Sequence, residues 1–223
     1  MEMRTIPACG MEVSLVGIGC NNFGGRSGRD ETRAVIHKAL DLGITFFDTA
    51  STYPVGNNGA SEELIGEFLG ERRKDIVLAT KFGLMFNGDP RRKGASRRHI
   101  VSTVEDSLRR LRTDWIDLYQ LHKPDPATPI EETLRALDDL IRQGKVRYVG
   151  CSNFAGWQIA DAEYLARSLG THRFVSNQSE YSLLNRDVEA EVIPALKHYG
   201  LGFLPYFPLA SGLLTGKYRP GQS

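Results

Sequence analysis

The chain has 223 residues, of which 41% are hydrophobic, so it can bury the core of one large domain or of two small ones. Its 28 basic and 27 acidic side chains leave a formal charge of +1, which excludes attraction to nucleic acid or to an anionic membrane as its main mode of binding. Three widely spaced cysteines predict neither a disulfide framework nor a zinc site, and no apolar run approaches the roughly 18 residues of a membrane span. We therefore expect a cytoplasmic protein with no nucleic acid and no membrane among its partners.

The first part of the chain predicts short strands that alternate with helices. Residues 4–14 favour two extended pieces joined as a hairpin that would form a lid, and residues 15–20 are typical of a first parallel strand. Asp30 can cap a helix that Gly43 ends. The apolar face of that helix comprises Val35, Ala39 and Leu42. The β-branched and aromatic run at 44–47 then predicts a strand buried on both faces.

The middle of the chain continues this alternation. Ser61 can cap a second helix, and residues 76–81 predict a third strand. Ser96 can cap a third helix whose apolar positions recur at helical spacing. These positions are Ile100, Val104, Leu108 and Leu111. Residues 115–122 predict a fourth strand.

The last part of the chain repeats the same unit. Thr128 and Glu131 form a capping-box pattern with a proline at the first helical position, which predicts a helix that Gly144 ends. The remaining strands are predicted at 146–153, 174–178 and 202–206, with helices at 157–169 and 188–199 between them.

Seven predicted strands thus alternate with six predicted helices, and glycine recurs where a helix meets the next strand. This pattern predicts stacked βα units with right-handed crossovers, for which the natural closure is a (β/α)8 TIM-barrel type of α/β fold. Such a barrel usually takes about 250 residues. The sequence stops at Arg219–Ser223, so we expect residues 1–223 to be a single barrel domain from which the last βα units are missing, truncated before strand eight.

Four polar residues fall at equivalent places in this pattern. Asp48, Lys81 and His122 end the second, third and fourth strands, and Tyr53 lies in the loop after the second strand. An isolated aspartate at such a place is more often a cap, and an isolated histidine is more often structural. The carboxyl ends of barrel strands meet at one mouth, however, so the four together predict a catalytic group.

Their chemistry suits proton transfer. A tyrosine has a pKa near 10, too high for efficient exchange at neutral pH. A nearby lysine ammonium favours the phenolate, and an aspartate offsets the cost of burying that lysine. A neutral histidine can polarise a carbonyl oxygen by donating an N–H. The group therefore predicts a general acid for the reduction of a C=O bond.

Several segments carry a further signal in their order along the chain. They are Phe47 to Tyr53, Gly59 to Glu62, Ala79 to Lys81, Leu121 and His122, Gly150 to Asn153, Asn177 and Gln178, and Tyr206 to Lys217. Together these segments resemble the aldo-keto reductase superfamily over nearly the whole chain. The resemblance implies an NADPH-dependent oxidoreductase that reduces small aldehydes or ketones to alcohols by hydride transfer, without a metal.

The resemblance also implies a role for each matching residue. Tyr53 would be the proton donor, Lys81 and Asp48 would tune it, and His122 would orient the carbonyl. Ser152, Asn153 and Gln178 would hold the nicotinamide carboxamide. The full set of implied cofactor-binding positions is Gly19, Asn21, Asp48, Ser152, Asn153, Gln178, Tyr206, Phe207, Pro208, Leu209, Ser211, Gly212, Leu213 and Lys217. From the residues alone, Ser152 and Asn153 could equally cap a helix, and Tyr206 could be a core aromatic.

Other interpretations stay open at this point. The superfamily includes ion-channel auxiliary subunits, so a cofactor-binding regulatory protein with little turnover is the alternative function. A metal-dependent hydrolase would need more histidine and aspartate ligands than His122 and Asp48. Carbonyl specificity is expected to depend on Phe23, Met85, Phe86 and Trp115. The segment that would bind adenosine is absent, so the choice between NADP and NAD, the substrate and the oligomeric state are not assigned.

Overall fold

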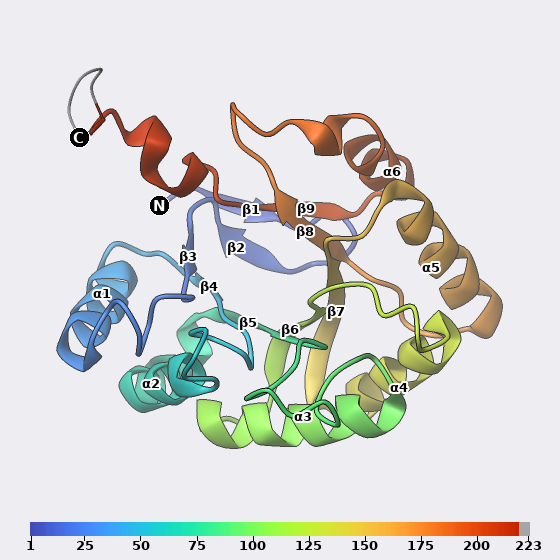
Figure 1. Cartoon of the computed structure of the whole chain (residues 1–223), viewed down its shortest axis with the longest axis horizontal. Helices are drawn as coiled ribbons and strands as arrows, with labels where there is room; N and C mark the ends of the chain where they lie inside the picture. Colours follow the sequence, from blue (N-terminus) through green and yellow to red (C-terminus); the bar gives the residue numbers. More distant parts are fainter. Residues whose placement is uncertain (219–223) are drawn as a thin grey trace.

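The computed structural model describes residues 1–218 of the chain. Within them, seven parallel strands form one curved sheet, and six α-helices lie around its outside (Figure 1). The strands are β3 (Gly17–Gly19), β4 (Phe46–Asp48), β5 (Val77–Phe82), β6 (Ile116–Leu121), β7 (Val146–Ser152), β8 (Ser176–Glu180) and β9 (Gly202–Tyr206). Their order in the sheet follows the sequence, from β3 to β9. The nearly closed parallel sheet with alternating helices confirms the predicted (β/α)8 barrel type.

The helices cover the sheet because each presents one apolar face to it. They are α1 (Arg29–Asp41), α2 (Ala60–Leu69), α3 (Arg97–Leu111), α4 (Ile130–Arg142), α5 (Gly156–Leu169) and α6 (Val192–Tyr199). In α3 the four predicted positions, from Ile100 to Leu111, are all buried. In α1 the predicted face was right at Ala39, which is buried, but wrong at Val35 and Leu42, which are exposed. Ile36 and Leu40 are buried beside Ala39. The helix is rotated so that its 36 and 40 positions, four residues apart, meet the sheet.

A small hairpin closes one end of the barrel. It consists of β1 (Met3–Thr5) and β2 (Glu12–Ser14), which pair antiparallel as predicted. A separate core cluster joins the hairpin to the barrel. It contains Ile6, Met11 and Val13 in and beside the hairpin, together with residues of the barrel strands such as Phe46. The hairpin therefore forms a floor and not the expected lid, and the opposite end of the sheet is left as the mouth.

Three predicted helix caps form differently from the expectation. Asp30 lies in the first turn of α1 rather than at its cap, and Ser61 lies inside α2. The cap position of α4 is Pro129, without a side-chain cap hydrogen bond, and the Thr128 hydroxyl donates to the Asp125 carboxylate at 2.8 Å. Only Ser96 caps as predicted, accepting from the backbone N–H of His99 at 3.4 Å.

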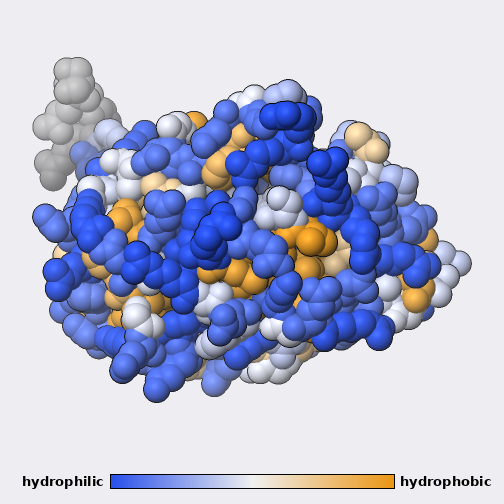
Figure 2. Space-filling view, turned by 90° about the horizontal axis from the view of Figure 1, so that it is seen from below, coloured by the Kyte–Doolittle hydropathy of each residue, from blue (hydrophilic) through white to orange (hydrophobic). Residues whose placement is uncertain are grey.

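Polar side chains dominate one face of the outer surface (Figure 2). The face seen in Figure 2 is mostly hydrophilic, with separate hydrophobic patches between the polar side chains. Within residues 1–218, none of the helices has the length and apolar character that a membrane span requires. Residues 219–223, on which the expectation of missing βα units depends, lie outside the described part of the chain.

Candidate active site

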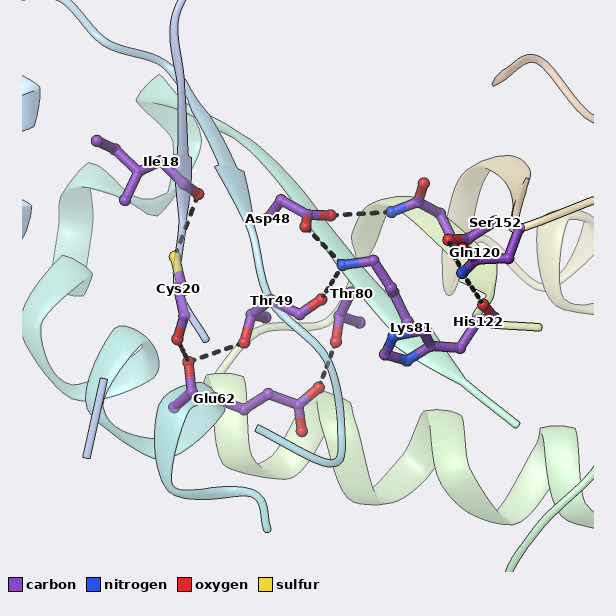
Figure 3. Close-up of polar contacts among 12 residues, drawn as sticks. Ile18, Cys20, Asp48, Thr49, Glu62, Thr80, Lys81, Gln120, His122 and Ser152 are labelled. Carbon is purple, nitrogen blue, oxygen red and sulfur yellow. Dashed lines mark hydrogen bonds and ion pairs between the residues drawn. The ribbon is translucent and has the colours of Figure 1, made fainter. Parts of the chain in front are cut away.

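The barrel mouth is built by strands that end in polar residues. Asp48 is the last residue of β4, Lys81 is next to the last residue of β5, and His122 directly follows β6. Parallel pairing brings these ends into one layer, with Lys81 in register with Gln120 of β6. Figure 3 shows the side chains of Asp48, Lys81 and His122 converging from three neighbouring segments. The predicted juxtaposition of these three residues is thus present in the structure.

A buried ion pair lies at the centre of this layer. The Lys81 ammonium donates to Oδ2 of Asp48 at 2.5 Å and to the backbone carbonyl of Thr49 at 2.9 Å. The side chain of Lys81 is fully buried, and that of Asp48 is 15% exposed. Oδ1 of Asp48 accepts from the Gln120 amide at 3.0 Å. These contacts offset the cost of removing both charges from water.

Tyr53 lies over this ion pair. The Lys81 Nζ is 5.2 Å from the centre of the Tyr53 ring, and the ring meets that of His122 edge to face at 5.7 Å between centroids. The backbone carbonyl of Tyr53 accepts from the N–H groups of Gly59 and Ser61, which fixes the loop against the start of α2.

The pKa of the Tyr53 phenol is raised above its ordinary value. Burial is the largest cause, the charge of Lys81 opposes it, and the charge of Asp48 adds to it. Lys81 favours the phenolate as expected, but burial outweighs it, so the net shift of the pKa is upward. The phenol is protonated at neutral pH, which is the state a proton donor requires.

His122 is a neutral imidazole in this setting. Burial and the charges of Lys81 and Lys123 lower its pKa to about 3. Its Nδ1 is buried and has no hydrogen-bond partner within residues 1–218. A neutral imidazole beside a phenol carries one ring N–H, which it can donate to a carbonyl oxygen.

A second polar cluster lies across the mouth, at the ends of β7, β8 and β9. The Asn153 amide donates to the Ser152 hydroxyl and to the backbone carbonyl of His122, each at 3.0 Å. Its Oδ1 accepts from the Tyr206 hydroxyl at 2.9 Å. Ser152 and Gln178 are in register on β7 and β8. The Ser152 hydroxyl can still donate, and Oδ1 of Asn153 keeps one lone pair, so the cluster offers both a donor and an acceptor.

The segment after β9 turns sharply at the mouth. Phe207, Ala210 and Ser211 have φ values of 51°, 48° and 54°, and Gly212 has a φ of 98°. Its side chains, including Leu209 and Leu213, are largely exposed. Two of the predicted cofactor-binding positions in this segment lie side by side. The Lys217 Nζ is 3.2 Å from the position that a Cβ on Gly212 would take. The other predicted positions Gly19 and Asn21 flank Cys20, whose N–H donates to the Asp48 carbonyl at 2.9 Å.

Sequence reasoning missed three groups that support the ion pair. Gln120 and the Thr49 carbonyl contact it directly, and Ser61 bonds to both the Thr49 hydroxyl at 2.9 Å and the Cys20 carbonyl at 2.8 Å. A signal for Gln120 exists in the sequence, because it lies two residues before His122 and strand side chains alternate between faces. The carbonyl and hydroxyl contacts depend on loop geometry that the sequence does not display.

One expected specificity residue is in the wrong place. Trp115 precedes β6, whereas His122 follows it, so the two lie at opposite ends of the strand. The guanidinium groups of Arg73 and Arg147 each lie over the Trp115 ring, 4.7 Å from its centroid. It therefore has a structural role near the floor. Phe86 is likewise covered by arginines, with Arg92 at 4.1 Å.

The architecture and the site together define a (β/α)8-type barrel with acid–base groups at its carboxyl-end mouth. No group of three potential metal ligands occurs among the described residues. Comparison with known proteins then identifies the family. The model described as "Aldo/keto reductase family" matches residues 15–223. The chain belongs to the aldo/keto reductase family, and this membership supports an oxidoreductase.

Similar proteins include both enzymes and channel subunits by name. "Uncharacterized oxidoreductase YrpG" of Bacillus subtilis (strain 168) is 41% identical, over 97% of this chain and 69% of that protein. "Aldo-keto reductase YhdN" of the same organism is 40% identical, over 97% of this chain and 65% of that protein. The "Probable voltage-gated potassium channel subunit beta" of Oryza sativa subsp. japonica is 39% identical, over 100% of this chain and 68% of that protein. The chain thus spans about two thirds of the length of these relatives.

Proposed function

We propose that this protein is an NADPH-dependent oxidoreductase that reduces small aldehydes or ketones to alcohols. The observation that carries the proposal is the convergence of Tyr53, Lys81, Asp48 and His122 at the mouth of one barrel. Tyr53 is the proton donor, since it is protonated and close to both an ammonium and a neutral imidazole. His122 donates an N–H to the substrate oxygen and orients it toward the Tyr53 hydroxyl.

The ion pair supplies the charge control. As negative charge develops on the substrate oxygen, Tyr53 gives its proton to that oxygen and becomes a phenolate. The Lys81 ammonium stabilises this phenolate. Asp48 and the Thr49 carbonyl keep that ammonium in place without a swing of its side chain. Burial of Tyr53 limits the access of water to the proton that is transferred.

The second cluster suits a nicotinamide carboxamide. The Ser152 hydroxyl, the Asn153 Oδ1 and the Gln178 amide would bind its oxygen and its nitrogen. Tyr206 would stack on the ring, and the turn from Phe207 to Lys217 would hold the pyrophosphate. When bound, the reduced cofactor supplies the hydride. The preference for the 2′-phosphorylated cofactor comes from the family and from no residue of this chain.

The proposal also covers the domain organisation, the partner and the location of the protein. Residues 1–223 act as a single barrel domain whose partner is a small carbonyl compound. The three cysteines are free, which agrees with a cytoplasmic location. The second candidate is a cofactor-binding auxiliary subunit with little turnover, favoured by the 39% identity to a protein named as a channel subunit.

The experiment that separates the two candidates gives a simple aromatic aldehyde to the wild type and to Tyr53→Phe. Reduction of the aldehyde is measured as the oxidation of NADPH. An enzyme oxidises NADPH with the aldehyde, and Tyr53→Phe loses at least about 100-fold in kcat while still quenching cofactor fluorescence. Wild-type protein that quenches but does not turn over would favour the auxiliary subunit. Full turnover by Tyr53→Phe would show that the assigned acid is wrong.

A further inference from the structure

Gln120 occupies an unusual place for an uncharged polar residue. It lies on β6 in register with Lys81 of β5, and it is fully buried. Its amide Nε2 donates to Oδ1 of Asp48 at 3.0 Å, while Lys81 occupies Oδ2 of the same carboxylate at 2.5 Å. Each oxygen of Asp48 therefore has its own donor, one supplied by β5 and the other by β6 (Figure 3).

Gln120 is not the type of residue that usually fills the interior of a barrel. The interior layers of such barrels are mostly filled by branched apolar side chains, as Leu118 does two residues earlier on β6. The Gln120 Oε1 is buried without a hydrogen-bond partner in the described chain, and burying such a group carries a cost. The contact of Nε2 with Asp48 is the interaction that offsets this cost.

We propose that Gln120 is a positioning residue for the reaction: it occupies Oδ1 of Asp48, leaves Oδ2 to Lys81, and so sets the charge that the ion pair presents to the Tyr53 phenol. The inference rests on the proposed function in taking Tyr53 as the acid. Gln120 itself touches neither the phenol nor a substrate in this assignment, and it acts through Asp48.

The direction of its effect follows from the groups around the phenol. The titratable groups that face Tyr53 are Asp48 of β4, Lys81 of β5, Cys20 after β3, His122 after β6 and Tyr206 of β9. The charge of Asp48 raises the pKa of the phenol and that of Lys81 lowers it. The N–H dipole of Gln120 offsets part of the Asp48 charge, so its removal leaves that charge less compensated. The pKa of Tyr53 then rises further.

Gln120→Met tests this, because methionine keeps the length of the side chain and removes both polar groups. The readout is the carbon-13 shift of tyrosine Cζ during an alkaline titration, with the Tyr53 signal assigned from Tyr53→Phe and the fold followed by circular dichroism. We expect the onset of ionisation in Gln120→Met to move up by about half a pH unit or more. Ser176→Ala is the matched control, since it also removes a fully buried polar atom without a hydrogen-bond partner in the described chain and is expected to leave the onset unchanged.

A thermodynamic cycle keeps the inference testable if the ionisation begins only where the protein unfolds. Gln120→Met is made in the wild type and in Asp48→Ala, and unfolding in urea is measured at neutral pH. We expect Gln120→Met to lower the urea midpoint in the wild type and to leave it nearly unchanged in Asp48→Ala.

An equal loss in both backgrounds, or an unshifted Tyr53 ionisation in Gln120→Met, would overturn the proposal. Neither measurement uses cofactor or substrate. A protein without turnover would therefore refute the proposed function and leave the role of Gln120 to be decided separately.

Discussion

Replacing Lys81 by methionine should expose the cost of a buried unpaired carboxylate. Lys81 is fully buried and Asp48 is 15% exposed, and the two are joined at 2.5 Å. Removing one partner of a buried ion pair typically costs about 3–5 kcal/mol of unfolding free energy. Asp48 keeps the Gln120 amide and some contact with water, so we expect Lys81→Met to lose about 3 kcal/mol, near the lower end of that range.

The double variant Asp48→Asn, Lys81→Met removes both charges and is the matched control. Since no charge is then left buried alone, it should lie within roughly 1–2 kcal/mol of the wild type and be more stable than Lys81→Met. The assay is urea unfolding at pH 7, followed by circular dichroism, with the urea midpoints compared at a constant slope. A Lys81→Met protein within about 1 kcal/mol of the wild type, or a double variant less stable than Lys81→Met, would refute the reasoning.

Two further predictions concern stability. In Gly66→Ala the new Cβ would lie 2.5 Å from the backbone carbonyl oxygen of Arg110, so α2 and α3 must separate; we expect a loss of about 2 kcal/mol or more in urea unfolding. Gly28→Ala, at an open position with a φ of −66°, should be neutral or slightly stabilising, and an equal loss in both variants would contradict the packing argument. The second concerns pH: His122 has its folded pKa lowered to about 3, so it stays neutral in the folded protein while the unfolded chain takes up a proton below about pH 6.5. Stability should therefore be fully present above pH 6.5 and fall as the pH drops toward 3, by up to about 5 kcal/mol from this residue. His122→Asn should lack this part of the pH dependence, which urea unfolding at pH 7, 5 and 4 would reveal, and parallel curves for the two proteins would count against it.

The arrangement of the barrel can be predicted because one rule repeats along the chain. Each buried strand is followed by an amphipathic helix, and parallel strands place their carboxyl ends together. That rule alone brings Asp48, Lys81 and His122 to one mouth. The stripe of α3 follows from the helical period in the same way, and its four apolar residues are all buried.

Details that depend on competing polar partners could not be predicted in the same way. Thr128 has the pattern of a helix cap, yet the Asp125 carboxylate lies within reach and takes its hydroxyl. Trp115 is an aromatic residue expected at the mouth, although its position before β6 places it near the floor. The balance at Tyr53 is a third case, since burial outweighs the lysine and only the three-dimensional packing determines how deeply the ring is buried.

The origin of the hydrogen in the product tests the central claim most directly. The protein is given an aromatic aldehyde together with NADPH that carries deuterium at the transferable position of its nicotinamide ring, and the alcohol is analysed by mass spectrometry and proton NMR. We predict one deuterium on the carbinol carbon for each cofactor oxidised, because the hydride passes directly to the carbonyl that Tyr53 protonates. An unlabelled alcohol, or no alcohol from a protein that binds the cofactor, would contradict the account.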